Sequence, residues 1–273
     1  MAARRGTGPL LIGAIGLAIA FVATYFVFVR TYVGQVVDER AFMGASDQHD
    51  AIHRISGAVL GNVPIVAVGG GIVLTILIGA ITRRPRQIVV ALGVGVIATI
   101  AAELAKHVFL TRAETGATDL LGNSFPSGHA TVAASAAFAV FLVSPPRRRT
   151  LAAVLGSAFA VLTGVFLVID QWHRPSDVVA AFMLVAACGC IGGLVLLLWG
   201  VPPVERPARS PRALWWIAGA AAAVSIACLI VIVSTVEQHG SHLLIAYVGG
   251  SAAIVAAGAG LAAAGIRAFR SIS

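Results

Sequence analysis

Eight long apolar runs constrain this chain more than any other feature of its sequence. Only 11% of its 273 residues are charged, against about 25% in an ordinary soluble domain. A helix needs about 20 mostly apolar residues to cross a membrane. The runs therefore predict an all-α fold, a polytopic membrane bundle of about eight transmembrane helices. They lie at about residues 9–30, 57–82, 88–110, 128–144, 150–170, 175–199, 213–236 and 243–267.

Basic residues are concentrated in alternate loops. One set of loops, together with both chain ends, carries thirteen basic residues and one acid, whereas the other set carries six basic residues and ten acids. Basic loops stay in the cytoplasm. We therefore expect a multi-pass protein of the cell membrane with both termini cytoplasmic. Residues 31–56, 111–127, 171–174 and 237–242 would face outward.

The net charge of +8 fits basic cytoplasmic loops and gives no reason to expect a nucleic-acid partner. The chain has no zinc-finger pattern, no aromatic-interleaved basic patch and no basic helix of the nucleic-acid-binding kind. We therefore expect membrane lipids, and not nucleic acid, as its surroundings and partners.

The third apolar run ends with ionisable residues. Glu103, Lys106 and His107 have the spacing i, i+3 and i+4, so they share one helix face, and Arg112 follows. Ionisable residues inside a membrane segment are costly and usually functional. Lys106, the only lysine of the chain, could alternatively extend its stem to the membrane interface.

Phe125-Pro126-Ser127-Gly128-His129 precede the fourth run. Ser127 suits a helix N-cap. A helix N-terminus presents free N–H groups and a partial positive charge, so it can hold a phosphate oxygen. Gly128 would let a phosphate approach the backbone, with His129 in reach. An ordinary turn with a capping serine is the alternative.

Trp172-His173-Arg174-Pro175-Ser176-Asp177 precede the sixth run. Pro175 suits the first turn of a helix, which places His173 just ahead of the helix and Asp177 in its first turn. A carboxylate there can hold one imidazole nitrogen and leave the other free to attack a substrate. A histidine at the interface without a catalytic role is the alternative.

All three clusters fall on the same outer face. Together they suit phosphoryl transfer through a phosphohistidine, in which one histidine attacks phosphorus and the other protonates the leaving oxygen. Cations and backbone N–H groups would stabilise the transferring group. This chemistry needs no metal and no cofactor. Asp47, His49, Asp50 and His53 could form a metal site, but we expect them to be a solvated outer face.

These residues resemble the type 2 phosphatidic acid phosphatase family, also called lipid phosphate phosphatases, over roughly residues 55–200. The motif Pro-Ser-Gly-His is complete at 126–129, and His173 and Asp177 keep the spacing of the third motif. The resemblance implies a six-helix membrane core with a metal-independent site. By family role His173 would be the nucleophile, Asp177 its orienting partner and His129 the general acid, and phosphate would be bound by Lys106, Arg112, Ser127 and Gly128.

The chain departs from the family motifs in two places. Five residues separate Lys106 from Arg112 where the family has six, and Ala113 stands where the family has proline. The Ser-Arg pair of the third motif would fall at 166–167, where this chain has Phe166 and Leu167. Arg174 is the residue that we expect to supply the missing phosphate contact from the loop.

The resemblance implies an integral membrane phosphatase for a lipid phosphate or a polyprenyl pyrophosphate, acting at the extracytoplasmic face. A phosphotransferase using the same site and a non-catalytic lipid-phosphate-binding protein, which Leu167 favours, are alternatives. A transporter fits less well because transporters bind near the bilayer midplane. We expect an N-terminal helix and outer loop (1–54), a phosphatase-like core (55–200), a cytoplasmic linker (201–212) and two C-terminal transmembrane helices (213–273).

Overall fold

The computed structural model describes residues 4–46, 50–118, 122–201, 211–238, 240–270 and 272, and every regular element in these ranges is a helix. The predicted all-α fold is therefore confirmed. Most of the predicted linker, at residues 202–210, lies outside the described residues.

The α-helices are α1 (Arg4–Thr24), α2 (Tyr32–Met43), α3 (Asp50–Pro64), α4 (Gly71–Ile81), α5 (Pro85–Leu104), α6 (Gly128–Val143), α7 (Pro146–Ile169), α8 (Pro175–Leu198), α9 (Arg212–Ser234) and α10 (Leu243–Ala268). Three π-helical segments continue α1, α3 and α5, namely η1 (Tyr25–Val29), η2 (Ile65–Gly70) and η3 (Ala105–Phe109).

Six helices of the described chain are long and apolar enough to cross a membrane. The run predicted at 57–82 forms a seventh span only if α3 and α4 are counted together, because the chain bends there by 45°. The bend follows Pro64, which removes one helix hydrogen bond. The run predicted at 128–144 forms the shorter helix α6, with 16 residues.

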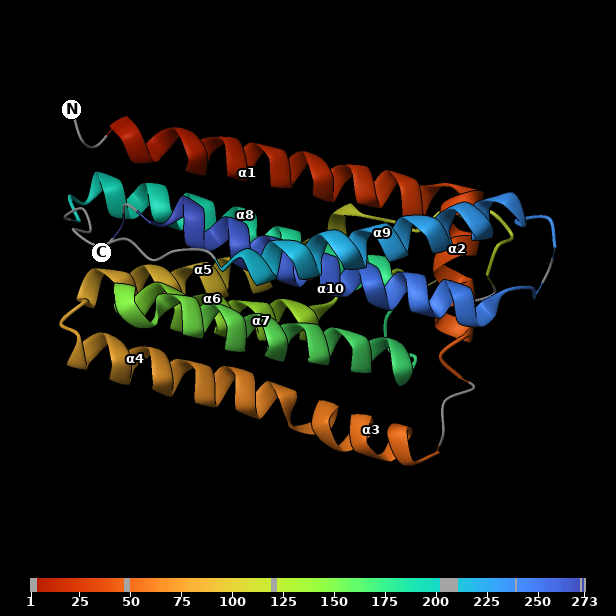
Figure 1. Ribbon diagram of the computed structural model, residues 1–273, viewed down its shortest axis with the longest axis horizontal. Coiled ribbons are helices and arrows are strands. Elements are labelled where there is room, and N and C mark those ends of the chain that lie inside the picture. The colour runs from red at the N-terminus through yellow and green to blue at the C-terminus, as the bar shows by residue number, and fades with distance from the viewer. Residues whose placement is uncertain are drawn as a thin grey trace.

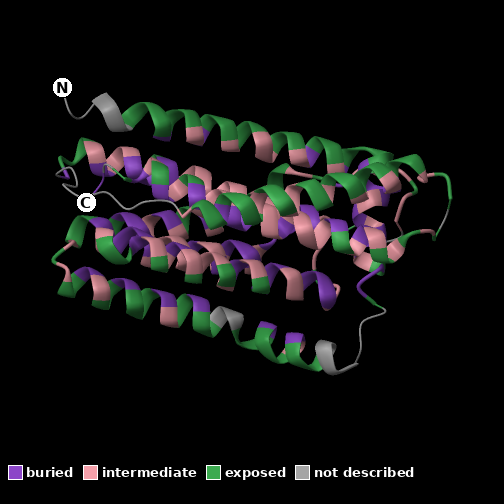
Figure 2. Ribbon diagram, in the orientation of Figure 1, coloured by how far each residue is buried: buried purple, intermediate pink, exposed green. Residues whose placement is uncertain are grey.

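Large apolar side chains cover the outside of the bundle. Ile12, Ile65 and Trp216 are each more than 70% exposed, and exposed residues follow the outer faces of α1 and α4 in Figure 2. A soluble monomer rarely exposes apolar surface on this scale. The outer surface is therefore suited to lipid, as the apolar runs predict.

Most helices lie along the long axis of the molecule, whereas α2 crosses one end of it (Figure 1). The start of α1 and the end of α10 lie at the other end. We call these the α2 end and the terminal end. The loop before α6 and the loop before α8 both open at the α2 end, so the polar clusters of the sequence meet there.

Close helix contacts fix the start of α8 at the α2 end. A Cβ added at Gly164 of α7 would lie 2.5 Å from Val178 Cγ1, and one added at Gly250 of α10 would lie 2.5 Å from Pro175 Cγ. Small residues let membrane helices approach this closely. The first turn of α8 is thus held from two sides.

The crosswise helix α2 is fastened to the last two helices by Arg40. This side chain is 5% exposed, and its Nη2 donates to the carbonyl oxygens of Thr235 (3.0 Å), Val236 (2.9 Å) and Gln238 (2.9 Å). These carbonyls lie just beyond the end of α9, where those of Thr235 and Gln238 otherwise accept local turn hydrogen bonds. Arg40 therefore links α2 to the C-terminal pair.

Replacing Arg40 with methionine removes all of these charge-assisted hydrogen bonds. Each such bond stabilises by about 1.5–3 kcal/mol, so we expect the melting temperature in detergent to fall by roughly 5–10 °C. Arg148→Met, at an exposed position near the terminal end, is the matched control and should change it little. Equal effects of the two substitutions would contradict this role of Arg40.

Candidate active site

Asp177 is the buried carboxylate at which the loops of the α2 end meet. Its Oδ2 accepts hydrogen bonds from Ser124 Oγ (2.7 Å) and the backbone N–H of Arg174 (3.1 Å). The same oxygen lies 3.4 Å from Nδ1 of His173, whose side chain is 12% exposed. The structure thus brings His173 and Asp177 together, and it adds Ser124. A proton on Nδ1 directed at this carboxylate leaves Nε2 as the free nitrogen of the ring.

The N-terminus of α6 packs against the start of α8. Ser127 caps α6, as the sequence predicts, because its Oγ accepts from the N–H of Ala130 (3.3 Å). Its own N–H donates to the backbone oxygen of Asp177 (3.0 Å). The Pro-Ser-Gly-His loop and the His173 loop are therefore joined through the backbone.

Lys106 lies beside the first residue of α6. A Cβ added at Gly128 would lie 3.5 Å from Lys106 Nζ and 2.9 Å from Glu103 Oε1. Lys106 Nζ is also 3.3 Å from Glu103 Oε1. The ammonium group and the free N–H groups of the helix N-terminus thus share one small region beside Gly128.

Asn123 fixes the π-helical turn that carries Lys106. Its Nδ2 donates to the carbonyl oxygens of Lys106 (3.1 Å) and Leu110 (2.9 Å) at the end of η3. π-helical turns inside α-helices occur frequently at functional sites. The amide of Asn123 supplies hydrogen bonds that the ending helix does not.

His129 completes the cluster. Its ring contacts the Trp172 ring edge-on, with centroids 5.2 Å apart. It also lies within electrostatic range of His173, Lys106 and Glu103. Both imidazoles that the sequence singled out therefore belong to one site.

Arg112 is a buried cation that makes no side-chain hydrogen bond in the described part of the chain, with Asp177, Asp38 and Glu39 in electrostatic range. It is 8% exposed, and none of its three guanidinium nitrogens has a hydrogen bond among the described residues. Burial lowers the pKa of Arg112, and the neighbouring Arg174 lowers it further. A buried charge without hydrogen bonds is costly. Its position between these loops is therefore suited to an anionic ligand.

The N-terminal segment of the chain holds the loop that carries Arg112. The hydroxyl of Tyr25 donates to the carbonyl oxygen of Thr111 (2.9 Å), and Gln35 Nε2 donates to that of Ala113 (2.8 Å). Gln35 belongs to α2, so the helix that crosses the α2 end also positions this arginine.

Arg174 forms an ion pair with α2. Its Nε and Nη2 lie 3.0 and 2.7 Å from Glu39 Oε2, and Nη2 donates to Thr118 Oγ1 (3.2 Å). Leu167, at the place of the missing arginine, is fully buried, and its carbonyl oxygen accepts from the N–H of His173 (3.2 Å). The side chain at 167 thus belongs to the core, while its backbone supports the His173 loop.

Asp38 is a site residue that sequence reasoning missed. Its carboxylate accepts from the N–H (3.2 Å) and the hydroxyl of Ser176 at the start of α8. Burial, and then the charge of Asp177, raise the pKa of Asp38 to about 7. One sequence feature marks this region: a run of charged residues follows the first apolar segment, at Asp38, Glu39 and Arg40. Polar residues just before Pro126 likewise mark Asn123 and Ser124.

The raised pKa of Asp38 predicts a dependence of stability on pH. The folded protein binds this proton more tightly than the unfolded chain, so the contribution is fully present below about pH 4 and is lost as pH rises through about 7. Its full size is roughly 4 kcal/mol. In detergent, stability should fall less between about pH 5 and pH 8 in Asp38→Asn than in the unchanged protein. Parallel curves would contradict the shift.

The described residues contain no group of three or more His, Cys, Asp or Glu side chains placed to hold a metal ion. Of the alternative metal site considered above, Asp47 and His49 lie outside the described residues. The cluster at the α2 end brings together two histidines, the carboxylate of Asp177 and cationic groups around a helix N-terminus, with the carboxylates of Asp38, Glu39 and Glu103 beside them.

Comparison with known proteins agrees with this cluster. Residues 65–199 match the family model of the PAP2 superfamily. No match to the chain was found among curated proteins or among solved structures. The matched part runs from η2 to the end of α8 and contains Lys106, Arg112, His129 and His173. The resemblance noted in the sequence is thereby confirmed as a match of residues 65–199 to the PAP2 superfamily.

Proposed function

We propose that the protein is a membrane phosphatase that removes phosphate from a lipid phosphate or a polyprenyl pyrophosphate through a phosphohistidine. The observation that carries the proposal is the guanidinium of Arg112, which has no hydrogen bond among the described residues and lies within electrostatic range of Asp177, the partner of His173. Arg112 supplies an anion-binding group, and His173 supplies a nucleophile. The match to the PAP2 superfamily supports phosphatase activity in general.

In the first step Nε2 of His173 attacks phosphorus, and the bond from phosphorus to the leaving oxygen breaks. Asp177 keeps the Nδ1 proton in place and stabilises the positive ring that forms. His129 donates a proton to the leaving oxygen, which departs as an alcohol or a phosphate. Water then attacks the phosphohistidine with His129 as the base, and free phosphate and His173 are restored.

The phosphate oxygens would be bound by three groups of different origin. These are the free N–H groups at Gly128, the ammonium group of Lys106 and the guanidinium of Arg112. Fixed donors of this kind stabilise charge in the transition state without reorganisation. While Arg174 is paired with Glu39, it would influence the site only through its charge. It would contact phosphate only if this ion pair opened.

The proposed site faces the outer side of the cell membrane. The loops at the terminal end carry arginine clusters at 83–86 and 147–149, which favour the cytoplasm. A lipid head group would then enter the α2 end from the outer leaflet, with its chains between the helices.

His173→Ala should abolish phosphate release from phosphatidic acid, phosphatidylglycerol phosphate and polyprenyl pyrophosphates, assayed with purified protein in detergent. His129→Ala should lower kcat by about 10²–10⁴-fold, because it removes the general acid and base. His107→Ala is the matched control, since this exposed histidine lies outside the proposed reaction and pairs with Glu103, and it should keep activity. Unchanged turnover in His173→Ala would contradict the mechanism.

Arg112→Met separates binding from stability. It removes a buried charge that has no hydrogen bond in the described part of the chain, so the ligand-free protein should melt a few degrees higher, while kcat/KM falls by about 100-fold or more. Arg174→Ala instead breaks an ion pair and should lower both. An Arg112→Met protein with full activity would overturn the anion-binding role, and unchanged phosphate release in Arg174→Ala would show that Arg174 does not contribute.

A further inference from the structure

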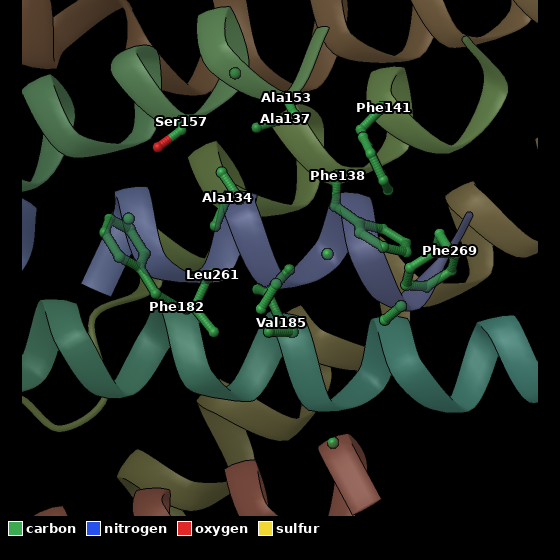
Figure 3. A pocket seen from close by; sticks show the side chains of 18 of the residues that line it. Ala134, Ala137, Phe138, Phe141, Ala153, Ser157, Phe182, Val185, Leu261 and Phe269 are labelled. Carbon is green, nitrogen blue, oxygen red and sulfur yellow. The ribbon is translucent and has the colours of Figure 1, made fainter. Parts of the chain in front are cut away.

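A large cavity lies away from the candidate active site. It has a volume of about 870 Å³ and lies between α1, α6, α7, α8 and α10 (Figure 3). Its lining includes Pro9 and Gly13 near one end of the chain and Phe269 and Arg270 near the other. The start of α1 and the end of α10 lie at the terminal end of the bundle, so the cavity occupies that half.

A layer of fully buried residues separates the cavity from the active site. Ala130 and Ala133 of α6 pack with Val178 and Ala181 of α8, all of them at 0% exposure. Ala134 and Phe182, the next residues along these helices, line the cavity. The cavity is therefore a separate site and not an extension of the one that holds His173.

The lining suits a hydrocarbon chain better than water. It consists mainly of alanine, glycine, phenylalanine and leucine, and among the described lining residues Ser157 alone carries a hydroxyl group. Apolar cavities stay free of water and take apolar ligands. The lining of α10 runs from Gly258 to Phe269, roughly 16 Å at the helical rise, and half of a bilayer's hydrocarbon core is about 15 Å thick. One lipid chain of a single leaflet matches this length.

The mouth of the cavity is basic. Arg267 and Arg270 line it, both are exposed, and neither has an acidic partner in the part of the chain that the structure describes. Arg267 lies over the ring of Trp215, 5.9 Å from its centre. Basic pockets between membrane helices bind anionic lipid head groups. The positive charge of these two arginines therefore favours a lipid with an anionic head group.

We propose that this cavity binds one hydrocarbon chain of an anionic phospholipid, with the lipid phosphate held by Arg267 and Arg270. The site joins the family core to α1, α9 and α10, which lie outside the matched residues 65–199. A bound lipid would fill the space between the core and these helices. The inference does not depend on the proposed catalytic activity.

Cavity-filling substitutions test the proposal with the purified full-length protein in detergent. Binding of phosphatidylglycerol is measured by native mass spectrometry and by titration with a fluorescent phosphatidylglycerol. A Cβ added at Gly265, which lines the cavity, meets no atom within 4 Å, and the same holds at Gly219 on the exposed side of α9. Gly265→Leu should weaken binding at least about 10-fold, whereas Gly219→Leu should bind as the unchanged protein does.

A second set of measurements tests the role of the head group and controls for misfolded variants. Ser157→Leu fills the cavity from α7 and should also weaken binding, with melting temperatures showing that each variant is folded. The double variant Arg267→Gln and Arg270→Gln should lose the preference for phosphatidylglycerol over phosphatidylcholine. His173→Ala should bind the lipid normally, which separates this site from the catalytic one. Equal binding by Gly265→Leu and the unchanged protein, no binding by the unchanged protein, or no preference for the anionic lipid would overturn the proposal.

Discussion

The carboxylate of Asp177 is the interaction on which the arrangement of the α2 end depends. It accepts hydrogen bonds from Ser124 and the backbone of Arg174, and it faces the His173 ring. The backbone oxygen of the same residue accepts from Ser127. One buried residue in the first turn of α8 thus aligns the loop before α6 with the loop before α8. A helix N-terminus favours a negative charge in its first turn. The start of α8 therefore stabilises the Asp177 carboxylate at the position from which it orients His173.

The matched family segment does not form this site alone. Helix α2, which precedes it, supplies Asp38 to Ser176, Glu39 to Arg174 and Gln35 to the loop that carries Arg112. Arg40 then connects α2 to the end of α9. The N-terminal segment and the C-terminal helix pair therefore act as a frame around the PAP2 segment. Through Glu39, this frame also holds Arg174 in place. Arg174 is the arginine of the His173 loop in a chain that has leucine at 167.

The features predicted correctly from sequence are those with a local physical cause. Apolar runs must be helical in a membrane, and Ser127 caps the helix that follows it. The meeting of the polar clusters at one end also followed, because ionisable residues avoid the middle of a membrane. The crosswise helix α2 was not predicted, since its mixed polar sequence lacks an apolar run. The pairing of Arg174 with Glu39 was missed because 135 residues separate them and no local pattern marks such a contact.

The central claim is that one phosphate-like anion binds between His173 and the buried Arg112. A structure of the purified protein with vanadate, a mimic of phosphate in its transition state, tests it most directly. The account predicts vanadium bonded to Nε2 of His173, with its oxygens on Arg112, Lys106 and the N–H groups at Gly128. Vanadate bound elsewhere, or absent from this site while the Arg112 guanidinium stays without a hydrogen bond, would contradict it.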